Sequence, residues 1–130
     1  MLKDDGKPIV GSQRDMLGVR ENGRDIPIDS GNIVHPGAGG LSVAPEWRVL
    51  PPFLIPRRLS SKVGDARGNA QLAIFRLGMA DFIDSTIGQF LRLRVTSAMH
   101  GSIEPAMISA LADYQAQLAA TREEWVFDET

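Results

Sequence analysis

The chain of 130 residues contains no cysteine. Disulfide bridges, thiolate metal sites and a cysteine nucleophile are therefore excluded, and a reducing compartment such as the cytoplasm is the expected location. Histidine is also scarce, because His35 and His100 are the two histidines of the chain and lie far apart. Neither has a second histidine at helical spacing, and Gly101 and Pro105 predict an extended backbone that holds Glu104 away from His100. We therefore expect no metal site.

Long apolar runs and a strong net charge are missing as well. No stretch of about 18 uncharged apolar residues occurs, and the N-terminal residues lack the apolar segment of a secretion signal. The formal net charge is -2 and the sequence pI is about 5.6, without a run of Lys or Arg suited to a nucleic-acid backbone. These absences disfavour a membrane span and nucleic acid as the main ligand. They predict a cytoplasmic protein, or one delivered into a target cell without a Sec signal.

Glycine and proline, by contrast, are abundant, with 13 and 8 residues that crowd the first half of the chain. Together with a hydrophobic content of 43%, the length predicts a single domain over 1–130, with 1–15 as a flexible arm or a first short strand. The expected fold class is α+β. We expect small, strongly twisted antiparallel sheets, irregular proline-rich loops and a C-terminal helix.

Short strands are predicted where a few β-prone residues stand between turn residues, at 16–20, 41–44, 70–77 and 99–103. The strongest strand signal is the alternation from Leu91 to Val95, which places Arg92 and Arg94 on the outward face. Asn22-Gly23 predicts a turn with positive φ. Residues 79–87 fit either a short helix or a loop.

The middle of the chain is predicted to be irregular. Four prolines within 45–56 exclude a helix or a central strand there, so the apolar residues between them, Trp47 and Phe53 among them, predict an ordered loop against the core. The polar stretch 57–69 that follows is predicted to be the most mobile part of the chain.

The last third predicts one amphipathic helix that begins at Pro105 and docks on the sheet. Its apolar stripe has the spacing of a helix and consists of Met107, Leu111, Tyr114, Leu118 and Trp125.

The glycine run Gly37-Ala-Gly-Gly40 stands directly before Leu41-Ser42-Val43. A phosphate loop would need a helix after the glycines, and a hydrolase elbow would need a second glycine after Ser42, so both are disfavoured. Two interpretations remain open. The run is either a tight turn into a strand, or the floor of a pocket in which Ser42 reaches a ligand.

Two charged residues have a functional and a structural interpretation. Glu104 stands at a strand end before a proline, where a carboxylate can polarise a substrate hydroxyl, or it is a solvated glutamate near a helix N-terminus. Arg20 could grip a phosphate, or it is a surface arginine beside Glu21.

The order arginine, serine after a turn, glutamate on a late strand resembles the layout of ADP-ribosyltransferases. A closer similarity is to small type VI secretion effector toxins with an ADP-ribosyltransferase-like fold. It rests on Gly39-Gly40 before Leu41-Ser42-Val43, on Leu50-Pro51-Pro52-x-Leu54, and on His100-x-x-Ile103-x-Pro105-Ala106 entering a terminal helix that ends on a tryptophan.

The resemblance implies NAD as the cofactor and an unknown acceptor for the ADP-ribose. It implies that Glu104 is catalytic and orients the ribose hydroxyl, and that Arg20, or failing it Arg14, holds the pyrophosphate. Ser42 and Gly40 would form the nicotinamide pocket. The aromatics available to stack on nicotinamide are Tyr114, Trp47 and Phe53. A cognate immunity protein, or another protein partner, is the implied macromolecular partner.

Two departures from the family pattern affect the expected acceptor. Ser102 stands where many of these transferases have the first acidic or amide residue of Glu-x-Glu, and Leu41 stands where a threonine often follows the glycines. A non-catalytic interaction module would tolerate both changes. Such a module, using the apolar segment from Trp47 to Ile55 as its surface, is the alternative function.

Overall fold

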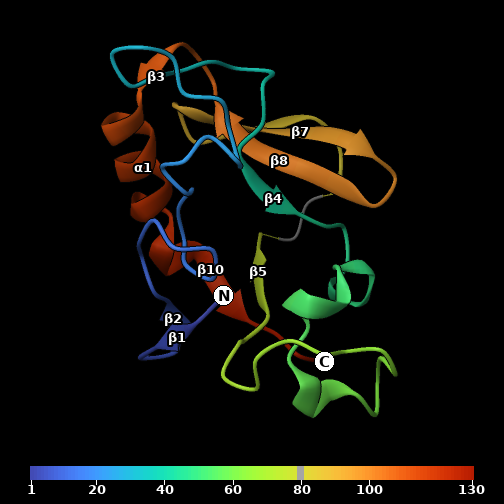
Figure 1. Ribbon diagram of the computed structural model, residues 1–130. Helices are drawn as coiled ribbons and strands as arrows, with labels where there is room; N and C mark the ends of the chain where they lie inside the picture. Colours follow the sequence, from blue (N-terminus) through green and yellow to red (C-terminus); the bar gives the residue numbers. More distant parts are fainter. Residues whose placement is uncertain (79–80) are drawn as a thin grey trace.

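The computed structural model describes residues 1–78 and 81–130 (Figure 1). It is a small α+β protein of antiparallel sheets with one long helix near the C-terminus, which confirms the predicted class. The largest sheet has the strand order β4-β8-β7-β6. Its strands are β4 (Leu41–Val43), β6 (Ser85–Ile87), β7 (Leu91–Ser97) and β8 (His100–Pro105).

The alternation of β7 is confirmed. Leu91 is buried, and Leu93 pairs with the buried Ile103 of β8 on the core side, while Arg92 and Arg94 lie on the other side. The strand predicted at 41–44 is β4, and the extended segment predicted beside β7 is β8. Of the ambiguous segment 79–87, residues 79 and 80 lie outside the described residues, and its end forms β6.

Three two-stranded sheets complete the fold. They pair β1 (Lys3–Asp4) with β2 (Lys7–Pro8), β3 (Ile33–Val34) with β9 (Ser109–Ala110), and β5 (Phe75–Leu77) with β10 (Trp125–Phe127). The sequence predicted either a flexible arm or a short strand for residues 1–15. The structure has the β1–β2 hairpin there. The N-terminal amine donates to the carbonyl of Ala73 at 2.9 Å.

The helix α1 (Leu111–Ala120) begins later than the sequence predicts. Pro105 ends β8, Met107 is 53% exposed in the connection, and the backbone N–H of Leu111 donates to Asn32 at 2.8 Å. The helix begins at Leu111 because β9 pairs with β3, and this pairing keeps residues 109–110 extended. The stripe is confirmed where it is helical, because Leu111, Tyr114 and Leu118 are buried. Trp125 is also buried, but in β10.

The strand predicted at 16–20 is wrong. Leu17 forms a lone bridge with Val10, and the next backbone groups bind a side chain instead of a strand. The amide of Gln115 on α1 accepts from the N–H of Val19 at 3.0 Å and donates to its carbonyl at 2.6 Å. A side-chain amide therefore takes the place of a strand neighbour and ties this segment to the helix.

Buried side chains form two clusters. The main one lies between α1 and the sheets and contains Leu17, Val19, Ile26, Val34, Leu91, Ile103, Leu111, Tyr114, Leu118 and Trp125. The second contains Ile55, Leu59, Ala66 and Ile74, with Trp47, Leu50 and Val63 packed against it.

The proline-rich segment packs inward as predicted, against the second cluster rather than the main one. It forms three 3-10 helices, Trp47–Val49, Pro52–Leu54 and Arg57–Leu59, around the second cluster. The stretch 57–69 supplies part of that cluster. Its Arg58 donates to the carbonyls of Ala70 at 3.1 Å and Leu72 at 2.8 Å, which ties the beginning of the stretch to its neighbours.

Candidate functional site

The register of the four-stranded sheet places two rows of polar side chains on the face away from Ile103. Paired residues of antiparallel strands point to the same side of the sheet. The first row is Ser42, Ser102 and Arg94, and the second row is Glu104, Arg92 and Thr86. We call this side the outer face. Ser42 and Glu104 are diagonal neighbours on adjacent strands, with a separation of about 7–8 Å expected for such positions.

Glu104 is buried although it stands on the outer face. Its exposed fraction is 0%, and its two oxygens accept from Arg92 Nε at 2.5 Å and from Arg94 Nε at 3.0 Å. The interpretation of Glu104 as a solvated glutamate near a helix N-terminus is therefore wrong. Arg92 and Arg94 lie on the outward side as predicted, but they hold this carboxylate rather than only facing solvent.

The charges of this cluster are unequal. Two guanidinium groups face one carboxylate, so the cluster has an excess of one positive charge. Hydrogen bonds between ionised partners are short and strong, and the arginine side chains are still 40% and 33% exposed. The arrangement fixes the position of both guanidinium groups while leaving part of each open to solvent.

Gly40 packs closely against β8 and the side chain of Tyr114. A Cβ on Gly40 would be 2.2 Å from the carbonyl oxygen of Ile103 and 2.8 Å from the hydroxyl of Tyr114. That hydroxyl donates to the Ile103 carbonyl at 2.5 Å and accepts from the N–H of Leu41 at 3.2 Å. The space that the missing side chain leaves is thus filled by the Tyr114 hydroxyl and the neighbouring strand.

Tyr114 cannot stack on nicotinamide in this structure, which corrects the expectation for it. Its exposed fraction is 0%, and its ring belongs to the main hydrophobic cluster. Burial raises the pKa of the Tyr114 hydroxyl well above its usual range, although the hydrogen bond from Leu41 acts in the opposite direction. Its hydroxyl fastens β4 to β8.

The guanidinium group of Arg20 is bound by the carboxylate of Asp25. Its Nη2 donates to one oxygen of Asp25 at 2.8 Å, while its Nε and its backbone N–H donate to the other at 3.2 and 2.7 Å. Burial alone would raise the pKa of Asp25, but the hydrogen bonds from Arg20 outweigh it, so this pKa is lowered. The Asp25 carbonyl accepts from Gly40 at 2.8 Å. Arg20 therefore braces the glycine run, and within the described residues it has no contact with Glu104.

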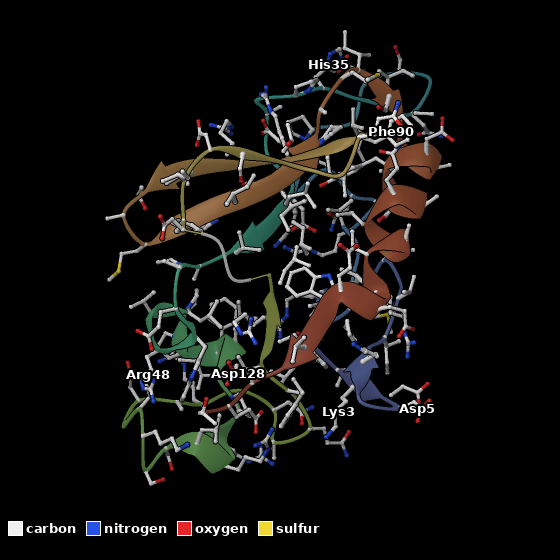
Figure 2. The ribbon with its side chains drawn as sticks, turned by 180° about the vertical axis from the view of Figure 1, so that it is seen from behind. Lys3, Asp5, His35, Arg48, Phe90 and Asp128 are labelled. Carbon is white, nitrogen blue, oxygen red and sulfur yellow. The ribbon has the colours of Figure 1, made fainter. Side chains whose placement is uncertain are left out.

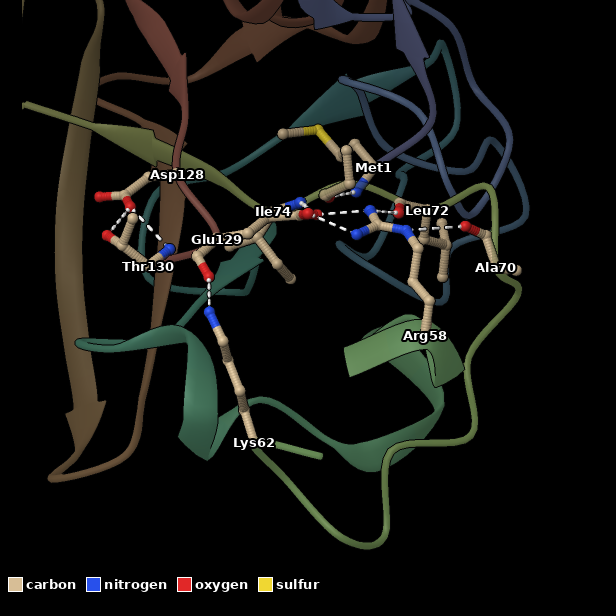
Figure 3. A network of polar contacts seen from close by, with 10 residues as sticks. Met1, Arg58, Lys62, Ala70, Leu72, Ile74, Asp128, Glu129 and Thr130 are labelled. Atoms are coloured by element: carbon tan, nitrogen blue, oxygen red, sulfur yellow. Dashed lines mark hydrogen bonds and ion pairs between the residues drawn. The ribbon is translucent and has the colours of Figure 1, made fainter. Parts of the chain in front are cut away.

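A second polar cluster, which the sequence did not indicate, lies at the end of the molecule opposite His35 and Phe90 (Figure 2). Arg58 forms a two-fold ion pair with Glu129, and Lys62 donates to the Glu129 carbonyl at 2.9 Å (Figure 3). Burial would raise the pKa of Glu129, but the bond from Arg58 outweighs it and the pKa is lowered. This cluster joins 57–62 to the C-terminal residues.

Two hollows of the described residues have linings that do not include Ser42, Arg92 or Glu104. One has a volume of about 150 Å³ and is lined by Val10, Gly11, Ser12, Leu17, Glu21 and Gln115. The other, of about 430 Å³, borders the second polar cluster through Lys3, Arg58, Phe127 and Glu129. On the outer face, Ser102 and Glu104 are buried, and Arg92 and Arg94 are partly exposed.

Comparisons with protein-family models, curated proteins and solved structures found no match to this chain. Among residues 1–78 and 81–130, no group of three or more histidine, aspartate or glutamate side chains could hold a metal ion. Within the same ranges, no helix has the length and apolar character needed to cross a bilayer.

Sequence reasoning missed the role of Arg92 and Arg94. Alternation placed them on one face, and the same rule places Ser102 and Glu104 together on theirs. The pairing register of β7 with β8, in which Arg92 lies opposite Glu104, is needed to show that all four side chains are on the same side of the sheet. The detectable signal was therefore charged and polar residues at every second position of two consecutive strands.

Proposed function

We propose that the outer face of the four-stranded sheet binds NAD and that the chain is an ADP-ribosyltransferase-like effector domain. The observation that supports this proposal is that Ser42 and Glu104 share this face on adjacent strands. The resemblance requires a serine and a glutamate on one face, but the buried Glu104 binds Arg92 and Arg94, so a ligand on this face would meet the arginines before the carboxylate.

The donor groups of the outer face fit the polar part of NAD. Within the described residues, the hydroxyl of the exposed Ser42 has no hydrogen-bond partner, and the side chains of Arg92 and Arg94 are partly exposed, whereas Ser102 is buried. Hydroxyl and guanidinium groups are common partners of ribose and phosphate oxygens. The stacking role implied for Tyr114 does not fit, because its ring is buried. NAD would supply the ADP-ribose group that is transferred.

Release of nicotinamide from NAD tests this proposal. The parent chain is expected to release nicotinamide, and Ser42→Ala is expected to slow the release by about tenfold, the loss of one hydrogen bond. Ser60→Ala is the matched control, since Ser60 is also exposed and lies in the turn after the third 3-10 helix. No release by the parent, or equal rates for the two serine variants, would contradict the proposal.

The segment from Trp47 to Ile55 supports a second candidate, a protein-interaction surface centred on Phe53. Phe53 is 42% exposed, while Ile55 is fully buried and Trp47 packs against the second cluster. In a Trp125→Phe background, acrylamide should quench the fluorescence of Trp47 only in part. Quenching as complete as for free tryptophan would extend the exposed surface from Phe53 to the whole segment and would favour the interaction module over the transferase.

A further inference from the structure

Arg92 and Arg94 differ from Arg20, Arg58 and Arg122 in the nitrogen atoms with which they bind the protein. Arg20, Arg58 and Arg122 bind protein oxygens through their terminal Nη atoms. Arg92 and Arg94 each bind Glu104 through Nε. Within the described part of the chain their Nη atoms have no hydrogen-bond partner.

The shared carboxylate brings the two guanidinium groups together. Residues two apart on one side of a strand have Cα atoms about 6.8 Å apart, and here both Nε atoms converge on the oxygens of Glu104. Because the Glu104 side chain is fully buried, it anchors the Nε ends from below. The four terminal amino groups of the two side chains, which are 40% and 33% exposed, are left without a protein partner within the described residues.

The neighbours of the two arginines are a backbone segment without a side chain and two serines. Arg92 Nη2 lies beside the glycine run, where a Cβ on Gly37 would be 4.0 Å away. Gly37 has φ +80, a backbone that favours glycine, so the chain passes the guanidinium without a side chain. The hydroxyls of Ser42 and Ser102 stand in the same row as Arg94.

We propose that Arg92 and Arg94 form a clamp for a diphosphate group and that Glu104 is the positioning residue that holds the clamp. The identity of the ligand as the diphosphate of a dinucleotide rests on the proposed function. The pyrophosphate role implied for Arg20 passes to this pair, because Asp25 already binds the Arg20 guanidinium. Guanidinium forks suit phosphate oxygens, and two adjacent forks suit two linked phosphates.

Calorimetric titration with inorganic diphosphate tests the clamp without any turnover. Arg92→Gln and Arg94→Gln should each weaken binding by about tenfold, and Arg92→Lys should weaken it less, since lysine keeps the charge but loses the fork. Arg57→Gln is the matched control, because it removes the same charge from an exposed arginine outside the sheet. Absence of binding by the parent, or equal weakening by Arg57→Gln, would overturn the clamp.

The Glu104→Gln variant distinguishes two effects of the carboxylate, which are positioning of the two arginines and electrostatic repulsion of an anion. If the carboxylate only repelled anions, removing its charge would tighten diphosphate binding. If it positions both arginines, the amide cannot accept from both Nε atoms, and binding should weaken by about tenfold although the cluster becomes more positive. Tighter binding in this variant would overturn the positioning role.

The clamp and the transferase proposal fail in different ways. Diphosphate binding that depends on Arg92 and Arg94, without any release of nicotinamide from NAD, supports the clamp and contradicts the proposed function. Titration with ADP-ribose and with inorganic diphosphate then shows whether the site takes a nucleotide or the free anion. Nicotinamide release with unchanged diphosphate binding by both arginine variants supports the proposed function and overturns the clamp.

Discussion

Replacing Gly40 by alanine tests whether this glycine serves the strand pairing or a ligand. The added Cβ would be 2.2 Å from the Ile103 carbonyl and 2.8 Å from the Tyr114 hydroxyl, whereas ordinary contact begins at 3.4 Å. Strands β4 and β8 must therefore move apart, which costs about 1–3 kcal/mol for overpacking and about 1–2 kcal/mol for the weakened Tyr114 hydrogen bonds.

The expected loss of stability is about 2–5 kcal/mol, which corresponds to a fall in Tm of about 8–20 °C for a domain of this size. Thermal unfolding followed by circular dichroism measures it. Gly23→Ala is the control, because its Cβ meets nothing within 4 Å and only the positive φ of +81 is strained, at about 1 kcal/mol.

Tyr114→Phe provides a second check on the same contact. It removes the hydroxyl that crowds the new Cβ, so the double variant with Gly40→Ala should be less destabilised than the sum of the single variants, by about 1 kcal/mol. A Tm for Gly40→Ala equal to that of Gly23→Ala would refute the packing argument. The missing side chain of Gly40 would then be open to a ligand.

Three further predictions concern buried groups. The pKa of Tyr114, the one tyrosine of the chain, is raised by burial, so stability should fall as the pH rises above 10.0 and tyrosinate absorbance should appear only with unfolding; a reversible titration near that pH in the folded state would contradict this. The pKa of Glu129 is lowered from 4.5, so its contribution is present above that pH and is lost as the pH falls below it. Glu129→Gln should therefore flatten the acid side of a plot of Tm against pH, and an unchanged slope would exclude this role. Gln115→Leu leaves both backbone groups of Val19 unpaired and should cost about 2–4 kcal/mol in urea unfolding, whereas Gln117→Leu, on the same helix, replaces a buried amide oxygen without a partner and should be nearly neutral. Equal losses for the two glutamine variants would contradict the bridging role.

The periodicity of apolar residues correctly predicted the strand and the helix that bury one side against the core. The alternation of β7 and the stripe of Leu111, Tyr114 and Leu118 are visible in the sequence because burial repeats at the period of the element. The start of α1 was not visible, since Pro105 is compatible with a helix and only the distant pairing of β9 with β3 keeps the chain extended to Ala110.

The candidate site was predictable in its residues but not in its contacts. Glu104 and Ser42 could be chosen because of their residue types and their places near strand ends. Their partners could not, because a shift of one residue in the register of β7 against β8 would turn Arg92 away from Glu104. The role of Tyr114 was predicted wrongly for a similar reason. Its place in the apolar stripe of the helix predicts that the ring is buried, but it does not predict that the hydroxyl binds Ile103 on a strand.

The energetics of Glu104 favour a role in orientation over a role in stability. Burying a carboxylate costs several kcal/mol, and two arginines that are 40% and 33% exposed return only part of this through screened ion pairs. An apolar side chain at this place would serve the fold about as well. An apolar side chain could not fix both Nε atoms and so hold the terminal amino groups of the two arginines, which have no partner within the described residues. The buried charge therefore determines where the arginines point, and it is the outward-facing donors, rather than the carboxylate, that a ligand would meet first.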